Sequence, residues 1–187
     1  MADRNEFELL AALFCYPQRG YVSKANRASE ALAARGSEIA APVRTFLERT
    51  RGLSLEDLQV LYTTTFDLDP VCSLEVGWHL FGENYERGEF LVRMRGELRR
   101  VGVTESAELP DHLSHALELL ARMDREEAAE FAGACLYPAL DKMSAAIKDR
   151  SNPFEYLLVA AVRLLELRYG RPEPVLGAAE PAFRILN

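Results

Sequence analysis

The sequence predicts an all-α fold, a compact single-domain bundle of about eight or nine helices. Apolar residues recur three or four positions apart along most of the chain, as at Tyr62 and Phe66, and this spacing places them on one helix face. Helix-start signals precede such segments, for example Ser54 followed three residues later by Asp57. No stretch of useful length alternates apolar and polar residues as a half-buried strand does.

Four helices are expected in the first part of the chain. They end near Pro17, Gly36, Gly52 and Phe66. The third is expected to start at a Ser37 cap and to hold Pro42 near its first turn, where the missing N–H costs little. The fourth is stopped by the turn residues that follow it, 67–70.

The second part begins with a short apolar patch, 76–82, for which a place in the core and a bent, exposed segment are both considered. Two glycines and a proline within twenty residues argue for the bent segment. A helix follows from about 85 to 101, with Leu91, Met94, Leu98 and Val101 as its apolar stripe.

Three more helices are expected near the end of the chain. Pro110 is expected to begin one of them, and a long helix over about 125–149 should be kinked or divided by Pro138. The helix from Phe154 to Tyr169 is apolar almost all round, which is typical of a central helix. We treat residues 1–187 as one domain and allow a hinge near 102–109.

Composition narrows the class of protein. The chain has 187 residues, 49% of them hydrophobic and 27% charged, as in an ordinary globular protein. Its net charge of −7 argues against a nucleic-acid-binding surface. Cys15, Cys72 and Cys135 lie far apart and form no CxxC pair, so they are interpreted as small core residues in a reducing cytoplasm. No apolar run approaches the roughly 20 residues of a membrane span.

No catalytic motif is recognisable: GxSxG, HExxH, Walker and GxGxxG patterns are all missing from the sequence. His112 and His115 stand three apart on an expected helix start beside Asp111, which is compatible with a metal site. Further ligands are not evident, so we predict neither metal nor catalytic residues. A metal-dependent enzyme using Asp111 and His112 remains the alternative.

Aromatic residues around a turn allow two interpretations. Trp78, His79, Phe81 and Tyr85 could simply be core, or they could form the wall of an apolar groove that accepts an amphipathic helix. Asp67 would add a carboxylate at the groove mouth, as would Asp69, and this suits a peptide with a basic residue beside an apolar run.

Arg87 and Gly88 open the long helix at 85–101. Structural roles are the first expectation for both. Arg87 is expected to form an ion pair, for instance with Asp67 or Glu83, and Gly88 to allow close helix packing.

One ordered set of residues resembles a known family. It comprises Tyr62, Phe66-Asp67, Ser73-Leu74, His79-Leu80, Gly82-Glu83, Glu86-Arg87-Gly88 and Leu109-Pro110-Asp111-His112-Leu113. The set spans roughly 62–120 and is similar to the NarJ-like nitrate reductase delta-subunit chaperones, which belong with the TorD/DmsD maturation proteins of molybdenum enzymes.

The resemblance implies a system-specific chaperone rather than an enzyme. Such a protein binds the N-terminal segment of the catalytic subunit of a molybdenum oxidoreductase. It assists insertion of the molybdopterin guanine dinucleotide cofactor before membrane attachment or export, without holding that cofactor stably itself. The expected location is cytoplasmic, and the expected state is a monomer or a helix-swapped dimer. The expected peptide-binding residues are Tyr62, Phe66, Asp67, Trp78, His79, Phe81, Arg87, Asp111 and His112. A helical regulator or scaffold unrelated to molybdenum enzymes is the third hypothesis.

Overall fold

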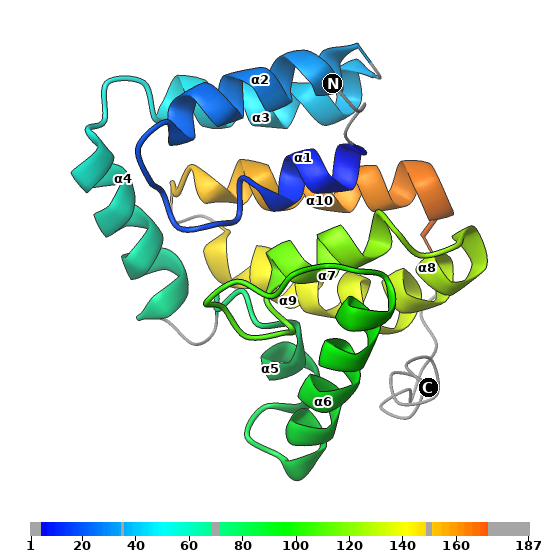
Figure 1. The fold of residues 1–187 in the computed structure, drawn as a ribbon. Coiled ribbons are helices and arrows are strands. Elements are labelled where there is room, and N and C mark those ends of the chain that lie inside the picture. The colour runs from blue at the N-terminus through cyan, green and yellow to red at the C-terminus, as the bar shows by residue number, and fades with distance from the viewer. Residues whose placement is uncertain (1–4, 35, 69–71, 149–150, 172–187) are drawn as a thin grey trace.

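A computed structural model describes residues 5–34, 36–68, 72–148 and 151–171 (Figure 1). Its α-helices are α1 (Glu6–Ala11), α2 (Tyr21–Ala33), α3 (Ser37–Arg49), α4 (Leu55–Tyr62), α5 (Val76–Phe81), α6 (Tyr85–Arg100), α7 (Leu113–Leu120), α8 (Arg125–Phe131), α9 (Tyr137–Ile147) and α10 (Phe154–Tyr169). Two π-helical segments, Thr63–Asp67 and Ala132–Leu136, continue α4 and join α8 to α9. No strand occurs in the described ranges, so the all-α prediction is confirmed. None of the described helices is long and apolar enough to cross a membrane.

Helix α10 occupies the centre of the molecule, as its sequence predicts. It packs against α1, α3 and α9, and Figure 1 shows it between the layer of α2 and α3 and the layer of α7 and α9. Leu157, Leu158, Leu164 and Leu165 on this helix are completely buried. A helix surrounded in this way needs apolar residues on several faces, which explains its composition.

Pro42 lies in the interior of α3 rather than in its first turn, because the helix starts at Ser37 with Gly36 as its N-cap. A proline there leaves the carbonyl four residues earlier without its helical N–H partner. That carbonyl belongs to Glu38, and it accepts a hydrogen bond of 3.1 Å from Nη1 of Arg163 on α10. The expected Ser37 cap and first-turn placement are therefore wrong, and a contact with the central helix supplies the missing donor.

Pro138 divides the long helix as predicted. The π-helical segment Ala132–Leu136 ends directly before α9, and Pro138 is the second residue of that helix. A wider turn at this point accommodates a residue that cannot donate to the helical ladder.

Two elements differ from the sequence-based expectations. Residues 76–81 form helix α5, a partly buried helix rather than the bent, exposed segment that was one of the two interpretations, and α7 begins at Leu113, three residues after Pro110. The backbone between Pro110 and Leu113 pairs with the segment before α5 instead of joining a helix. Its bonds run from Val76 N to the Asp111 carbonyl (2.9 Å) and from Leu113 N to the Leu74 carbonyl (2.8 Å).

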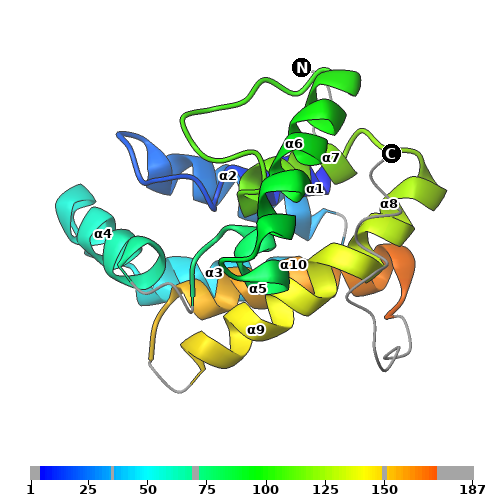
Figure 2. The ribbon, with the colours of Figure 1, turned by 90° about the horizontal axis from the view of Figure 1, so that it is seen from below.

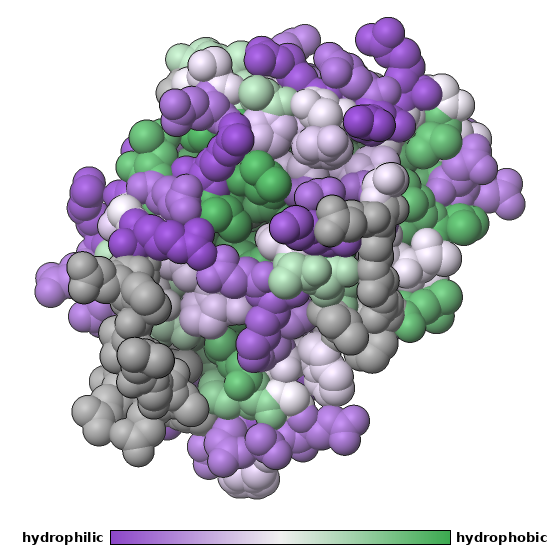
Figure 3. Space-filling model, turned by 180° about the vertical axis from the view of Figure 1, so that it is seen from behind, coloured by the Kyte–Doolittle hydropathy of each residue, from purple (hydrophilic) through white to green (hydrophobic). Residues whose placement is uncertain are grey.

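The apolar stripe of α6 is rotated from the predicted one. Phe90, Met94 and Leu98 are completely buried, whereas Leu91 and Val101 are only partly buried. Among the cysteines, Cys72 and Cys135 are buried as predicted but Cys15 is exposed. On the face opposite to Figure 1, hydrophobic side chains form separate patches bordered by hydrophilic ones (Figure 3).

Candidate functional site

The corner that carries the Pro-Asp-His sequence is joined to the start of α5 by backbone bonds. Glu75 and His112 form the isolated antiparallel β-bridge that these bonds create. Residues far apart in sequence are thereby held in a fixed register, and both adjoining helices start from it. The side chains of Asp111 and His112 are completely or almost completely buried in this corner.

Asp111 accepts a hydrogen bond from an unpaired backbone N–H in the first turn of α5. Its Oδ2 accepts a hydrogen bond of 2.8 Å from the N–H of Gly77, one of the donors that a helix start leaves unpaired. A Cβ on Gly77 would lie 2.7 Å from Asp111 Oδ2 and 2.9 Å from a ring carbon of Phe90, so only glycine fits there. Burial raises the pKa of Asp111 to about 6, although the Gly77 N–H and the charge of Arg87 act in the opposite direction.

His112 performs the corresponding role for α7. Its Nδ1 accepts from the N–H of Ser114 at 3.3 Å, which makes His112 the side-chain cap of that helix. Its Nε2 lies 3.5 Å from the hydroxyl of Tyr62, which donates to the Phe14 carbonyl at 2.8 Å. Burial, with a smaller effect of His115, lowers the pKa of His112 to about 3, so the ring is neutral.

The predicted groove residues Tyr62 and Phe66 belong to the core. Their rings pack against each other and against Phe154 of α10, with centroids 5.0 to 5.7 Å apart in the three pairs. Both are at most 3% exposed. These two side chains shape the interior and have no open surface to offer a peptide.

Helix α5 packs on α9, and Figure 2 shows the two helices side by side. An open, shallow hollow lies between them, on the other side of α5. Its volume is about 580 Å³, and it is lined by Trp78, His79, Gly82, Lys142, Ala145 and Ala146. We call these six residues the α5–α9 hollow. Lys142 donates to the carbonyl of His79 and so ties α9 to the end of α5, while His79 Nε2 bonds the Ser73 carbonyl at 2.7 Å. Burial lowers the pKa of His79.

Arg87 supports the tryptophan of this hollow. Its guanidinium carbon lies 5.4 Å from the centre of the Trp78 ring, a cation–π distance. The expected ion pair with Asp67 or Glu83 does not form, because the side chain is directed to the tryptophan. Arg87 Nε and Asp111 Oδ1 are buried atoms without a hydrogen-bond partner. Phe81 packs on the buried ring of Phe90, with centroids 5.5 Å apart.

Three carboxylates lie close enough to one another for their charges to act on each other's pKa. Burial raises the pKa of Glu108, and the charges of Asp67 and Glu75 raise it further. Burial and then Glu75 raise the pKa of Asp67. We call Asp67, Glu75 and Glu108 the acidic edge. It connects to the hollow through Ser73, whose hydroxyl bonds the Glu75 carboxylate and whose carbonyl bonds His79.

Apolar side chains adjoin the acidic edge in sequence. Leu68 follows Asp67 and is 71% exposed, and Leu109 follows Glu108 and is 42% exposed. The surface therefore offers negative charge beside exposed apolar side chains. Asp69, the other carboxylate expected here, lies outside the described residues.

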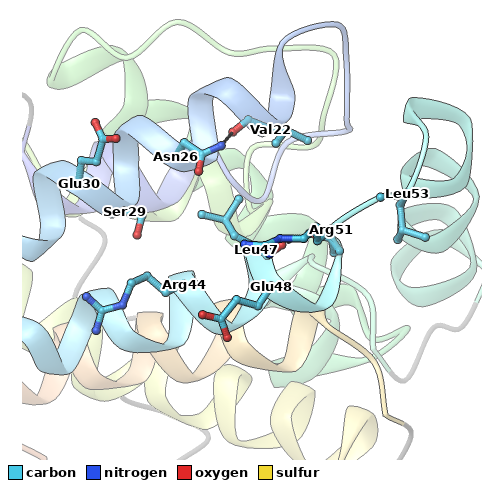
Figure 4. Close-up of a pocket in the computed structure, with 11 residues that line it drawn as sticks. Val22, Asn26, Ser29, Glu30, Arg44, Leu47, Glu48, Arg51 and Leu53 are labelled. Atoms are coloured by element: carbon cyan, nitrogen blue, oxygen red, sulfur yellow. Dashed lines mark hydrogen bonds between the residues drawn. The ribbon is translucent and has the colours of Figure 1, made fainter.

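A second hollow of about 440 Å³ lies between α2, α3 and the start of the following loop (Figure 4). Its charged lining residues are of both signs: Glu30 and Glu48 on one hand, Arg44 and Arg51 on the other. Figure 4 shows Glu30 projecting from α2 and Arg44 from α3 beside the opening. None of the predicted site residues lines it, and its mixed charge favours no particular ligand.

The predicted site residues thus separate into two groups. Tyr62, Phe66, Asp111 and His112 are sealed, and His79 contributes only an edge to the hollow. Asp67, Trp78, Phe81 and Arg87 remain at least partly accessible. Reasoning from sequence missed Lys142, Glu75 and Glu108, because only the tertiary fold brings them beside Trp78 and Asp67.

The described residues contain no group of three or more His, Cys, Asp or Glu side chains placed to hold a metal ion. Asp111 and His112 are engaged with Gly77 and Ser114, and neither reaches the surface. The accessible features in this part of the molecule are a hollow and a charged edge, an arrangement suited to binding a polypeptide.

Comparison with known proteins identifies the family. The model of the nitrate reductase delta subunit family matches residues 29–158, so the chain belongs to this family. The nitrate reductase molybdenum cofactor assembly chaperone NarJ of Escherichia coli K12 is 29% identical over 163 residues, which cover 85% of this chain and 69% of NarJ. The probable nitrate reductase molybdenum cofactor assembly chaperone NarW of the same strain is 30% identical over 127 residues, 66% of this chain and 54% of NarW.

Proposed function

We propose that this chain is a system-specific maturation chaperone, which binds the N-terminal segment of the catalytic subunit of a nitrate reductase and assists insertion of its molybdenum cofactor. Membership of the nitrate reductase delta subunit family is the observation that carries the proposal. The names of the E. coli relatives support the link to cofactor assembly. The chain acts by capture of a polypeptide and catalyses no bond chemistry.

The α5–α9 hollow and the acidic edge together form the proposed docking surface. An aromatic ring and two alanines suit the apolar side chains of an amphipathic segment, which a helix presents at positions i, i+3 and i+4. The carboxylates of the acidic edge suit a lysine or arginine next to that apolar run. Charge of this kind steers encounter and selects partners more than it adds affinity.

The sealed residues contribute to the proposed surface indirectly. Asp111 fixes the start of α5 through Gly77, and α5 carries Trp78. His112 fixes the start of α7, and its bridge with Glu75 holds one member of the acidic edge. The Pro-Asp-His corner is accordingly a positioning element for the surface and makes no contact with the client.

Calorimetry with a synthetic peptide tests this function. The peptide covers the N-terminal segment of the nitrate reductase catalytic subunit of the same organism, and its control has each lysine and arginine replaced by glutamine. We expect micromolar or tighter binding of the first peptide and weaker binding of the second. The absence of binding for every such peptide would contradict the proposal.

Recovery from a native lysate distinguishes a chaperone from a helical scaffold with other partners. We expect the catalytic subunit to be recovered with the tagged chain, and mainly in its cofactor-free form. Recovery of other proteins without that subunit would favour the scaffold.

A further inference from the structure

Helix α6 lies at the periphery of the molecule and packs on it through one side only. Phe90, Met94 and Leu98 face inward and are completely buried, and the helix contacts α5 and α7. Figure 1 shows α6 at the lower edge of the molecule, below α7.

The outward side of α6 carries exposed apolar residues and two glycines. Tyr85 is 81% exposed and Val92 is 69% exposed. Gly88, Val92 and Gly96 are spaced four apart, so they follow one another along a single stripe. A Cβ added to either glycine would meet no atom within 4 Å, so neither is needed for packing inside the chain. Because an interior glycine weakens a helix relative to alanine, the two glycines point to a close approach from outside.

Charge is segregated along this same helix. On its outward side Glu86 and Glu89 lie before Val92, whereas Arg95 and Arg99 lie after it. Arg87 and Glu97 break this order but lie on the inward side, Arg87 against Trp78 and Glu97 buried. Arg95 pairs with Glu105 at 2.9 Å. Within the described part of the chain Glu86, Glu89 and Arg99 have no ion-pair partner. A helix whose outward side is acidic in its first half and basic in its second is complementary to its own copy in the reverse direction.

We propose that α6 is a self-association surface, on which a second copy of this chain docks its own α6 in antiparallel orientation centred on Val92. A two-fold axis then brings the same patch of each copy together. It places Tyr85 level with Arg99 of the second copy, and Gly88 level with Gly96 of the second copy. The aromatic ring and the guanidinium can form a cation–π contact there.

The antiparallel direction follows from the charges. Parallel pairing would set Glu89 beside Glu89 and Arg99 beside Arg99 of the second copy, and like charges at such distances are destabilising. The glycines let the two backbones come close, so that the Val92 side chains of the two copies contact each other at the two-fold axis. No exchange of helices between the copies is involved.

Self-association is independent of the proposed peptide binding. Arg87 lies on the inward side of α6 against Trp78, and the described residues that line the α5–α9 hollow belong to α5, its C-cap Gly82 and α9. The paired state leaves this hollow open. One helix pair buries less than the roughly 1,200–2,000 Å² of stable interfaces, so we expect a concentration-dependent dimer of micromolar or weaker affinity.

Cross-linking tests the geometry. Exposed Cys15 is first replaced by serine, and Val92→Cys is compared with Val60→Cys, an equally simple change at a valine of α4 that is 59% exposed. Val92→Cys should give a disulfide-linked dimer under mild oxidation, at least tenfold faster than Val60→Cys. Equal rates for the two variants would overturn the proposal.

Sedimentation velocity over a range of concentrations tests the glycines and charges. Gly88→Ala with Gly96→Ala should raise the melting temperature of the monomer, because alanine favours the helix, while weakening the dimer by about tenfold or more. Glu89→Arg should also weaken the dimer, because Glu89 lies level with Arg95 of the second copy, and mixing it with an Arg95→Glu chain should restore association. A chain that sediments only as a monomer at millimolar concentration would overturn the proposal, as would alanine variants that dimerise as well as the original chain.

Discussion

The two sides of α5 differ in packing: one is buried and tightly packed, and the other is open. On the inner side the backbone N–H of Gly77 meets Asp111 in a space that leaves no room for a Cβ. On the outer side Trp78 and Lys142 border a hollow of about 580 Å³. The six-residue helix α5 therefore has a buried polar contact on one face and an open surface on the other.

This difference shows why a set of family residues need not be a single site. The sealed residues act on the fold: Asp111 and His112 each satisfy the start of a helix. The open residues, Trp78 and Asp67, are the ones that can meet a partner. Substitutions on the two sides should therefore affect different measurements, stability on the inner side and affinity on the outer side.

Gly77→Ala should have the largest effect on the inner side. The added methyl group collides with Asp111 and Phe90, and overpacking combined with a strained hydrogen bond should cost about 3 kcal/mol of unfolding free energy. Urea unfolding measures this. Gly96→Ala, at which nothing lies within 4 Å, is the matched control and should be neutral or slightly stabilising. Equal stabilities of the two variants would show that the space around Gly77 is not tightly packed.

Asp111→Asn should change how stability depends on pH. The amide oxygen can still accept from Gly77, but the variant cannot ionise. In the folded protein the pKa of Asp111 is raised to about 6, above its ordinary value, so the fold favours the protonated carboxyl. The stability that this provides is fully present below about pH 4 and is lost as the pH rises through about 6.

Unfolding of the original chain and of Asp111→Asn at a series of pH values checks this. Relative to the original chain, the variant should gain about 2 kcal/mol between pH 4 and pH 7. A difference that does not change with pH would mean that Asp111 is not the titrating group. Asp67 and Glu108 are present in both proteins, so their titration cancels in the comparison.

Trp78→Ala should act on affinity. Removing the aromatic wall of the hollow should weaken binding of the client peptide by about tenfold, since buried aromatic anchors carry much of such binding energy. Calorimetry measures the loss, and urea unfolding should show a smaller destabilisation than Gly77→Ala. Val60→Ala, a truncation on the exposed side of α4, serves as control and should leave the affinity unchanged. Unimpaired binding by Trp78→Ala would place the client elsewhere.

Asp67→Asn together with Glu108→Gln should have the smallest effect. Neutralising two members of the acidic edge should weaken peptide binding by about threefold at physiological salt, because charges near the surface are screened. The loss should be greater at low salt and vanish in high salt. Titrations at a series of salt concentrations distinguish this from a structural defect, which salt would not remove.

Sequence alone predicted the fold well and the site incompletely, for identifiable reasons. The central position of α10 and the break at Pro138 follow from local composition and backbone chemistry, and both are found. The late start of α7 could not be predicted, because Asp111 and His112 pair with a segment more than thirty residues earlier.

The division of the site residues was likewise not readable from the chain. Helical spacing places Tyr62 and Phe66 on one face, but only the packing of Phe154 against them shows that this face is interior. Lys142 and Glu108 reach the surface beside Trp78 and Asp67 through tertiary contacts that leave no local pattern.

The emission of Trp78 during a titration with the client peptide tests the central claim most directly. Trp78 is the single tryptophan of the chain and lines the α5–α9 hollow, so its fluorescence reports on this surface alone. Binding there should shift the emission to shorter wavelength and saturate with the dissociation constant that calorimetry gives. Binding recorded by calorimetry without any change in the emission would show that the client docks elsewhere.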